Sequence, residues 1–262
     1  MLGKLMKYEW KATAKFFLPL YLVTLILTPI TRVITNLEMF KKGPLSVISG
    51  TFILTYVLMM FALFIVSFVL VIYRFYKNMV TEEGYLMHTL PVTPAQHIIS
   101  KLIVAFCWNV ISCIVFLLSL FIFFFSPELI TDIRNIISEL VEGLKLLNTN
   151  GVLFIIEMAA MALIGLVHYI LYVYVSIAIG QVISRHKLLG AFASAIVINI
   201  VSQIITTVLC IPFVVTKMDN PEAISRIMFT QLFPLNILIT LVITAAFFFI
   251  TNYIMKKKLN LE

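Results

Sequence analysis

Six long apolar runs constrain this 262-residue chain more than any other feature. None of the runs contains a charged residue. Their bounds are Phe16–Thr31, Gly43–Tyr73, Leu102–Pro127, Met158–Ser184, Leu188–Thr216 and Ile227–Met255. The hydrocarbon core of a bilayer is about 30 Å thick, and a helix needs roughly 20 apolar residues to cross it. The runs therefore predict an all-α, polytopic membrane protein with six transmembrane helices.

The first run is shorter than the other five. It becomes long enough to span if the flanking Lys15 and Arg32 extend their side chains toward the two membrane surfaces. A cleaved signal peptide is the alternative, but no small-residue cleavage site follows Ile30, and five more spans come after it. We therefore expect a retained span.

Composition excludes the other broad classes. Hydrophobic residues make up 62% of the chain and charged residues 12%, against about 25% charged in soluble domains. The 22 Phe and 10 Tyr exclude a disordered chain, and three cysteines are too few for a disulfide scaffold. Cys107, Cys113 and Cys210 lie in apolar stretches, where small side chains pack well.

The basic residues indicate a topology with both termini in the cytoplasm, because short cytoplasmic loops carry an excess of Lys and Arg. On this topology 12 of the 19 basic residues lie inside, but only four of the 12 acidic residues do. The inner basic residues are Lys4, Lys7, Lys11, Lys15, Arg74, Lys77, Lys101, Arg185, Lys187, Lys256, Lys257 and Lys258. They border several membrane segments and form no single patch, so nucleic-acid binding is a poor interpretation.

Residues 1–15 resemble an amphipathic helix on the cytoplasmic membrane surface, ahead of a single six-helix domain of residues 16–262. Lys4, Lys7, Lys11 and Lys15 share one face at helical spacing. The opposite face holds Leu2, Met6, Trp10 and Phe17, with Glu9 and Thr13 as polar interruptions. A frayed basic tail is the alternative.

Two outer segments are also expected to be structured. Residues 128–150 combine isoleucines and leucines at helical spacing with charged residues, which predicts an amphipathic helix that covers the bundle or lies on the membrane. Residues 217–233 contain Asn220 followed by Pro221, a turn and helix-start signal, and we expect a short re-entrant segment there.

The most informative segment is residues 74–97, between the second and third apolar runs. Thr93 followed by Pro94, with Gln96 two residues on, is typical of a helix start, so the third span should begin there. Glu82 and Glu83 precede the apolar Tyr85, and an acidic pair beside exposed apolar residues suggests a surface that binds a protein partner. A solvated loop that packs on the bundle is the alternative.

This segment is similar to a known family. GluGluGlyTyrLeuMetHisThrLeuProVal from Glu82, followed by SerLysLeu at Ser100–Leu102, resembles the stretch after the second span in permease subunits of type-two ABC exporters from Gram-positive bacteria. The plan of an amino-terminal amphipathic helix, six spans and cytoplasmic ends resembles the same family.

The resemblance implies a fold, partners and a docking site. In that family the segment is a coupling helix that fits into a groove of a separate ATP-hydrolysing subunit, and a second permease chain, identical or homologous, completes the transporter. ATP and Mg would bind to the partner ATPase, and no cofactor is expected on this chain. The docking residues would be Glu82, Glu83, Gly84, Tyr85, Leu86 and Met87, with a smaller contact at Arg185, His186 and Lys187.

An enzyme is not expected, because each catalytic pattern fails on spacing. The only Gly followed by Lys is Gly3, so no phosphate-binding GlyxxxxGlyLysSer/Thr exists, and the four histidines form no HisGluxxHis zinc site. Glu82 and Glu83 resemble the GluGluxxxArg of intramembrane prenyl-type proteases, but Met87 stands at the Arg position.

Polar residues within the apolar runs are candidates for a substrate pathway, because ionisable groups in a bilayer are costly. They are Asn109, Glu157, His168, Asn199 and Gln203. Each has a structural alternative: Glu157 reaches the outer surface, His168 is a neutral hydrogen-bonded side chain, and the amides join helices. Gly190 with Ser194, and Ala191 with Ala195, predict close helix packing.

The leading hypothesis is the permease subunit of an exporter in the bacterial plasma membrane, which moves an amphipathic or hydrophobic substrate such as a peptide, drug or lipid. Two alternatives stay open. The chain could be a membrane scaffold or sensor without transport, or an ion-coupled carrier that uses Glu157 and His168. Internal repeats would favour a carrier, and residues 1–126 and 127–262 show no convincing repeat.

Overall fold

The computed structural model describes residues 2–37, 45–80, 92–146, 151–183, 187–215 and 228–257. These residues form seven α-helices and one short π-helix, in an all-α fold. Six of the described helices are long and apolar enough to cross a membrane, including the amino-terminal one. The chain is therefore a multi-pass membrane protein, as its six apolar runs predict.

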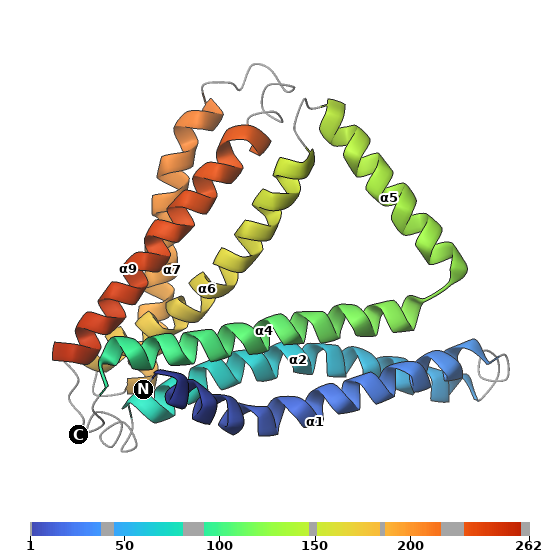
Figure 1. The fold of residues 1–262 in the computed structure, drawn as a ribbon, viewed down its shortest axis with the longest axis horizontal. Helices are drawn as coiled ribbons and strands as arrows, with labels where there is room; N and C mark the ends of the chain where they lie inside the picture. The colour runs from blue at the N-terminus through green and yellow to red at the C-terminus, as the bar shows by residue number, and fades with distance from the viewer. Residues whose placement is uncertain are drawn as a thin grey trace. The chain divides into compact units, whose positions relative to one another are not determined.

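The chain divides into two units, each described by itself. Unit 1 comprises residues 1–74 and 96–130, and unit 2 comprises residues 75–95 and 131–262. The three long helices of unit 1 are α1 (Leu2–Asn36), α2 (Ser46–Val80) and α4 (Pro94–Phe124). They run side by side along most of their length (Figure 1).

A buried cluster of apolar side chains holds unit 1 together. Its aromatic members come from all three helices and include Phe17, Tyr56 and Trp108. The outward positions of α2 are also apolar, with Leu54 and Phe61 largely exposed. Apolar side chains on both the inside and the outside of a bundle are typical of membrane helices, whose outer surface contacts lipid.

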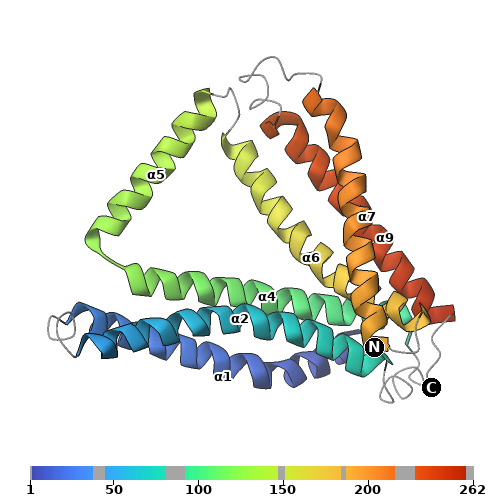
Figure 2. The same ribbon diagram turned by 180° about the vertical axis from the view of Figure 1, so that it is seen from behind.

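Unit 2 is built around α6 (Gly151–Ile183), α7 (Lys187–Val215) and α9 (Phe233–Lys257). These three helices also lie side by side, as the view from behind shows (Figure 2). The last turn of α2 belongs to this unit, and its Phe75 ring stacks on Tyr174 of α6 with centroids 4.0 Å apart.

The predicted close packing of α7 is confirmed. A Cβ atom added at Gly180 of α6 would overlap the backbone of Gly190 and Ala191. One turn further along α7, the Ser194 hydroxyl donates to the Ser176 carbonyl at 2.6 Å. Small residues thus allow the two backbones to approach each other directly.

Helix starts follow the capping signals of the sequence. Helix α4 begins at Pro94, where the sequence predicts it. Helix α5 (Pro127–Leu146) begins in the same way, with Pro127 at its first position and Ser126 as its cap, whose hydroxyl accepts a hydrogen bond from the Leu129 amide at 3.0 Å. The segment between the third and fourth spans is therefore helical from Pro127 to Leu146.

Three predicted boundaries differ from the structure. Residues 1–15 are not separated from the first span, because Leu2–Asn36 is one continuous helix. The fourth span begins at Gly151 rather than Met158, so Glu157 lies inside α6. Of the predicted re-entrant segment 217–233, residues 217–227 lie outside the described residues, and Met228–Leu232 form a π-helix that leads directly into α9.

Candidate functional site

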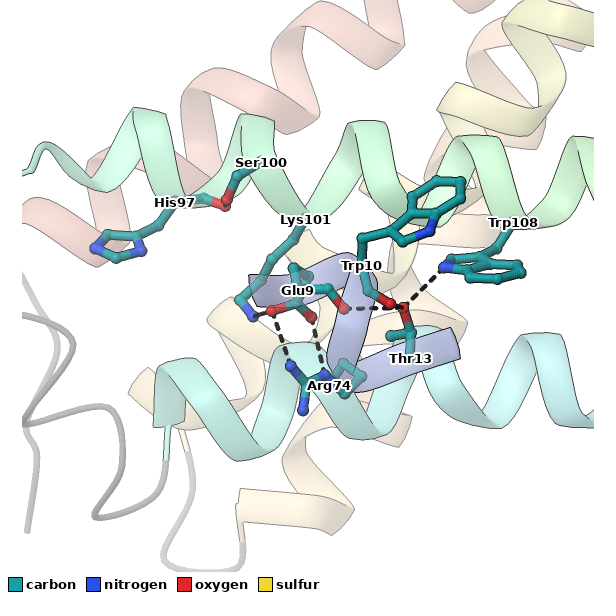
Figure 3. Close-up of polar contacts among 8 residues, drawn as sticks. All are labelled: Glu9, Trp10, Thr13, Arg74, His97, Ser100, Lys101 and Trp108. Atoms are coloured by element: carbon teal, nitrogen blue, oxygen red, sulfur yellow. Dashed lines mark hydrogen bonds and ion pairs between the residues drawn. The ribbon is translucent and has the colours of Figure 1, made fainter. Parts of the chain in front are cut away.

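The main polar feature of unit 1 is a buried ion cluster that joins its three long helices. The Glu9 carboxylate of α1 accepts hydrogen bonds from Nε and Nη2 of Arg74 in α2, both at 2.9 Å. It also accepts one from Nζ of Lys101 in α4 at 3.0 Å. Figure 3 shows the three side chains converging between their helices. We call Glu9, Arg74 and Lys101 the ion cluster.

The electrostatics of the ion cluster are those of one anion shared by two cations. Glu9 is 8% exposed and Lys101 4% exposed, so water screens these charges weakly. The contact between Arg74 and Glu9 is bidentate, which is the strong geometry for this pair. Removing one member of a buried pair leaves an uncompensated charge and costs about 3–5 kcal/mol. Both cations bond to Glu9, so its loss would remove the carboxylate that they share.

The inward position of Glu9 follows from the spacing of residues along α1. Glu9, Thr13, Phe17 and Tyr21 recur every four residues, and all four are buried. Lys4, Lys7, Lys11 and Lys15 are exposed. On a helical wheel, Glu9 and Thr13 are polar residues within an otherwise apolar face of α1. In the structure they are the residues through which α1 contacts α2 and α4.

Trp108 of α4 fits into the surface of α1 just beyond the ion cluster. Its ring stacks on Trp10 at 4.6 Å and on Phe17 at 4.7 Å between centroids. Its indole N–H donates to the Thr13 hydroxyl at 2.8 Å, as Figure 3 shows. The Thr13 hydroxyl in turn donates to the Glu9 carbonyl at 2.9 Å. The ion cluster and Trp108 are therefore linked through a single turn of α1.

Further along the bundle, hydroxyl groups of the same three helices meet at two more levels. The first level joins Tyr21, Ser67 and Ser112, and the second joins Thr28, Tyr56 and Ser119. The hydroxyl oxygens of Tyr21 and Ser112 are 2.7 Å apart, and those of Thr28 and Ser119 are 2.8 Å apart. Such bonds between membrane helices contribute about 0.6 kcal/mol each.

Arg32 lies near the carboxyl-terminal end of α1. Its guanidinium donates to the carbonyl oxygens of Ile122, at 2.8 Å, and Phe125. The Ile122 carbonyl belongs to the last turn of α4, and Phe125 directly follows this helix end, where acceptors are left unsatisfied and a cation is favourable. Arg32 therefore caps α4, in addition to the membrane-surface position that sequence analysis predicts for it.

The ion cluster flanks the segment to which the resemblance assigns partner docking. Arg74 lies within two turns of the end of α2, and Lys101 lies two turns after the start of α4. Lys101 is also the lysine of the SerLysLeu motif. The docking residues Glu82, Glu83, Gly84, Tyr85, Leu86, Met87, Arg185 and His186 lie outside the described residues, and Lys187 is the first residue of α7.

Of the five substrate-pathway candidates, Asn109 lies in unit 1 and the other four lie in unit 2. Asn109 donates to the Ala105 carbonyl of its own helix at 2.8 Å. His168 of α6 is 2.9 Å from the Thr244 hydroxyl of α9, which is the hydrogen-bonded arrangement of the structural alternative. Glu157 is half-buried, whereas Asn199 and Gln203 lie one turn apart on an exposed face of α7.

Sequence reasoning missed the ion cluster, although a signal was present. Glu9 is the only acidic residue among four lysines at the start of the chain, and it lies in register with Thr13 and Phe17.

Elsewhere, in the part of the chain that the structure describes, no three His, Cys, Asp or Glu side chains gather as a metal site would require. Comparison of the chain with protein-family models, with curated proteins and with solved structures finds no match.

Proposed function

We propose that this chain is the permease subunit of a type-two ABC exporter, which moves an amphipathic or hydrophobic substrate out of the cytoplasm. The ATP-hydrolysing subunit is a separate chain, and a second permease chain, identical or homologous, completes the pathway. The protein lies in the bacterial plasma membrane with both termini in the cytoplasm. The resemblance at Glu82–Met87, the six spans and the distribution of basic residues support this proposal.

The ion cluster is the structural observation that carries the proposal furthest. A partner that pushes on residues 81–91 pushes on the end of α2 and the start of α4. Glu9 ties both of these helix ends to α1 through Arg74 and Lys101. The three helices of unit 1 would then move as one body, as transmission of motion over a long distance requires.

The Trp108 contact extends this connection along the bundle. Because Thr13 bonds to both the Glu9 carbonyl and the Trp108 indole, a shift of the ion cluster also displaces the aromatic stack. Packed side chains with few voids transmit such displacements rather than absorb them. The docking segment, the ion cluster and the aromatic stack thus form one mechanical path in this proposal.

The test is purification of the tagged chain from its native host in mild detergent, followed by mass identification and an ATP hydrolysis assay. We expect a nucleotide-binding subunit to accompany the wild-type chain. The Glu82→Gln/Glu83→Gln/Tyr85→Ala variant should lose this subunit and substrate-stimulated hydrolysis. The control is Glu139→Gln/Glu142→Gln, which neutralises two exposed carboxylates on α5 and should retain both.

Two results would contradict the proposal. A wild-type chain that purifies alone, from cells in which ABC ATPase subunits are abundant, would favour the scaffold or the ion-coupled carrier. An ATPase that binds equally well to the docking variant would refute the assignment of docking to Glu82, Glu83 and Tyr85.

A further inference from the structure

Helix α5 differs from every other long helix of the structure in the separation of its apolar and polar residues. At about 100° per residue, its apolar residues from Leu129 to Val141 fall within an arc of about 140°. The members of this apolar face are Leu129, Ile130, Ile133, Ile136, Ile137, Leu140 and Val141. No polar residue from Glu128 to Glu142 falls within that arc.

This apolar face has no protein partner among the described residues. All of its members except Leu129 are exposed, with Ile137 55% and Leu140 59% accessible. An apolar surface of this length is costly in water, at roughly 25 cal/mol for each Å². Something apolar must therefore cover it.

The chain connections place α5 at the level of the membrane surface. Only Phe125 and Ser126 separate α4 from α5, and only residues 147–150 separate α5 from α6. Exposed apolar side chains continue to the very end of α4, at Phe124, and begin with the first turn of α6, at Val152. Both ends of α5 are therefore tied to points where membrane helices still present apolar surface to lipid.

The charged residues of α5 fit the same position. Arg134 lies at the border between the apolar and polar faces, where its long side chain can reach lipid phosphates. The four acidic residues of α5, Glu128, Asp132, Glu139 and Glu142, all lie on the polar face, outside the apolar arc. This places acidic groups in water and the basic group of Arg134 at head-group level.

We propose that α5 lies in the plane of the outer leaflet, with its apolar face in the boundary between head groups and acyl chains. The partner of this surface is the lipid bilayer itself. Helix α5 is then bound to lipid along its length, and its position responds to the packing of outer-leaflet lipids. This inference does not rest on transport or on an ATPase partner; it takes from the proposed function only the topology, which puts α5 on the outer side.

The test uses spin labels on the full chain in vesicles of phosphatidylcholine and phosphatidylglycerol. Cys107, Cys113 and Cys210 are first replaced by alanine, and a single cysteine is then introduced as Ile137→Cys or Glu139→Cys. These positions are two residues apart on opposite faces of α5. The measurement is how strongly each spin label is relaxed by collisions with oxygen, which partitions into lipid. It is compared with the relaxation of the same label by a water-soluble nickel chelate.

We expect oxygen to relax the label at position 137 several-fold more than the nickel chelate does, and the reverse at position 139. The Leu140→Cys and Glu142→Cys pair should repeat this contrast one turn further along. Strong relaxation by the nickel chelate at both faces would mean that α5 stands away from the membrane, which would overturn the proposal. A label at 137 that neither reagent reaches would mean that protein covers this face, and would overturn it equally.

Discussion

The two units of this membrane protein hold their helices together in different ways. In unit 1, polar side chains from α1, α2 and α4 meet at successive levels: the ion cluster, the Trp108 indole with Thr13, and two groups of hydroxyls. In unit 2, α6 and α7 meet backbone to backbone where Gly180 faces Gly190 and Ala191.

The two units differ in what prevents their helices from packing in other ways. A polar side chain that loses its hydrogen-bond partner in an apolar environment raises the free energy of the folded state. The arrangement of helices in unit 1 therefore depends on polar groups that pair with one another at set positions along α1, α2 and α4. Close contact of small residues depends on shape, so the contact of α6 with α7 in unit 2 depends also on the absence of a side chain at Gly180. Substitutions that remove a polar partner should therefore damage unit 1 most, and substitutions that add atoms should damage unit 2 most.

The largest effect is expected for Glu9→Gln. The variant removes the carboxylate that Arg74 and Lys101 share in a buried site, which should destabilise the protein by about 3–5 kcal/mol. Thermal unfolding in detergent measures the change. Glu139→Gln makes the same chemical change at an exposed position of α5 and should leave the unfolding temperature unaltered. Equal temperatures for the two variants would show that Glu9 is not buried in an ion pair.

Trp108→Ala should have a comparable but somewhat smaller effect. It removes the ring between Trp10 and Phe17 and leaves the Thr13 hydroxyl without its donor, at a cost of about 3–5 kcal/mol less any local collapse. Ile114→Ala, on an exposed face of the same helix, is the control. Unfolding temperatures in detergent compare the two, and a larger loss for Ile114→Ala would place the core of unit 1 elsewhere.

Gly180→Ala tests unit 2 by adding a single methyl group. The added carbon overlaps the backbone of α7, so we expect a loss of about 1–3 kcal/mol from the forced separation of α6 and α7. Gly165→Ala in the same helix meets nothing within 4 Å and should be neutral or stabilising. The comparison is again by unfolding temperature. If both substitutions are tolerated alike, the close approach of α6 and α7 is refuted.

The smallest effect is expected for Thr28→Val, which keeps the shape of the side chain and removes its hydroxyl. The lost bond to Ser119 should cost about 0.6 kcal/mol. Thr51→Val removes an exposed hydroxyl that donates to the Val47 carbonyl of its own helix and should cost less. Chemical denaturation of several replicate preparations can resolve this difference, and its reversal would argue against the hydroxyl levels as a source of stability.

Much of the architecture could be predicted from local sequence patterns. The apolar runs predicted six spans, and Pro94 predicted the start of α4. The spacing of Gly190 and Ser194 predicted close packing against another helix, but not which helix. Each of these features depends on residues within one helix or on the chemistry of one residue type. The solvent environment and the helix period therefore determine them.

The ion cluster could not be predicted in this way, because it depends on three helices meeting at one height. A helical wheel of residues 1–15 places Glu9 correctly but contains nothing about Arg74 or Lys101. The pattern of residues 1–15 therefore favoured a separate amphipathic helix. In the structure these residues are part of the continuous helix α1, and Glu9 and Thr13 are buried contact residues. The same reason explains why His168 could not be assigned its partner, Thr244 of α9, from sequence alone.

A double-mutant cycle over Glu9 and Lys101 tests most directly the claim that the ion cluster ties α1 to the helices beside the docking segment. Lys101→Met removes the more deeply buried cation, and the remaining Arg74 is exposed enough to reach water. We expect Glu9→Gln/Lys101→Met to unfold at a higher temperature than Glu9→Gln alone, because one of the two cations that Glu9 holds in the wild-type protein is gone. A double variant that is less stable than Glu9→Gln by the full effect of Lys101→Met would show that the two residues act independently, and would contradict the account.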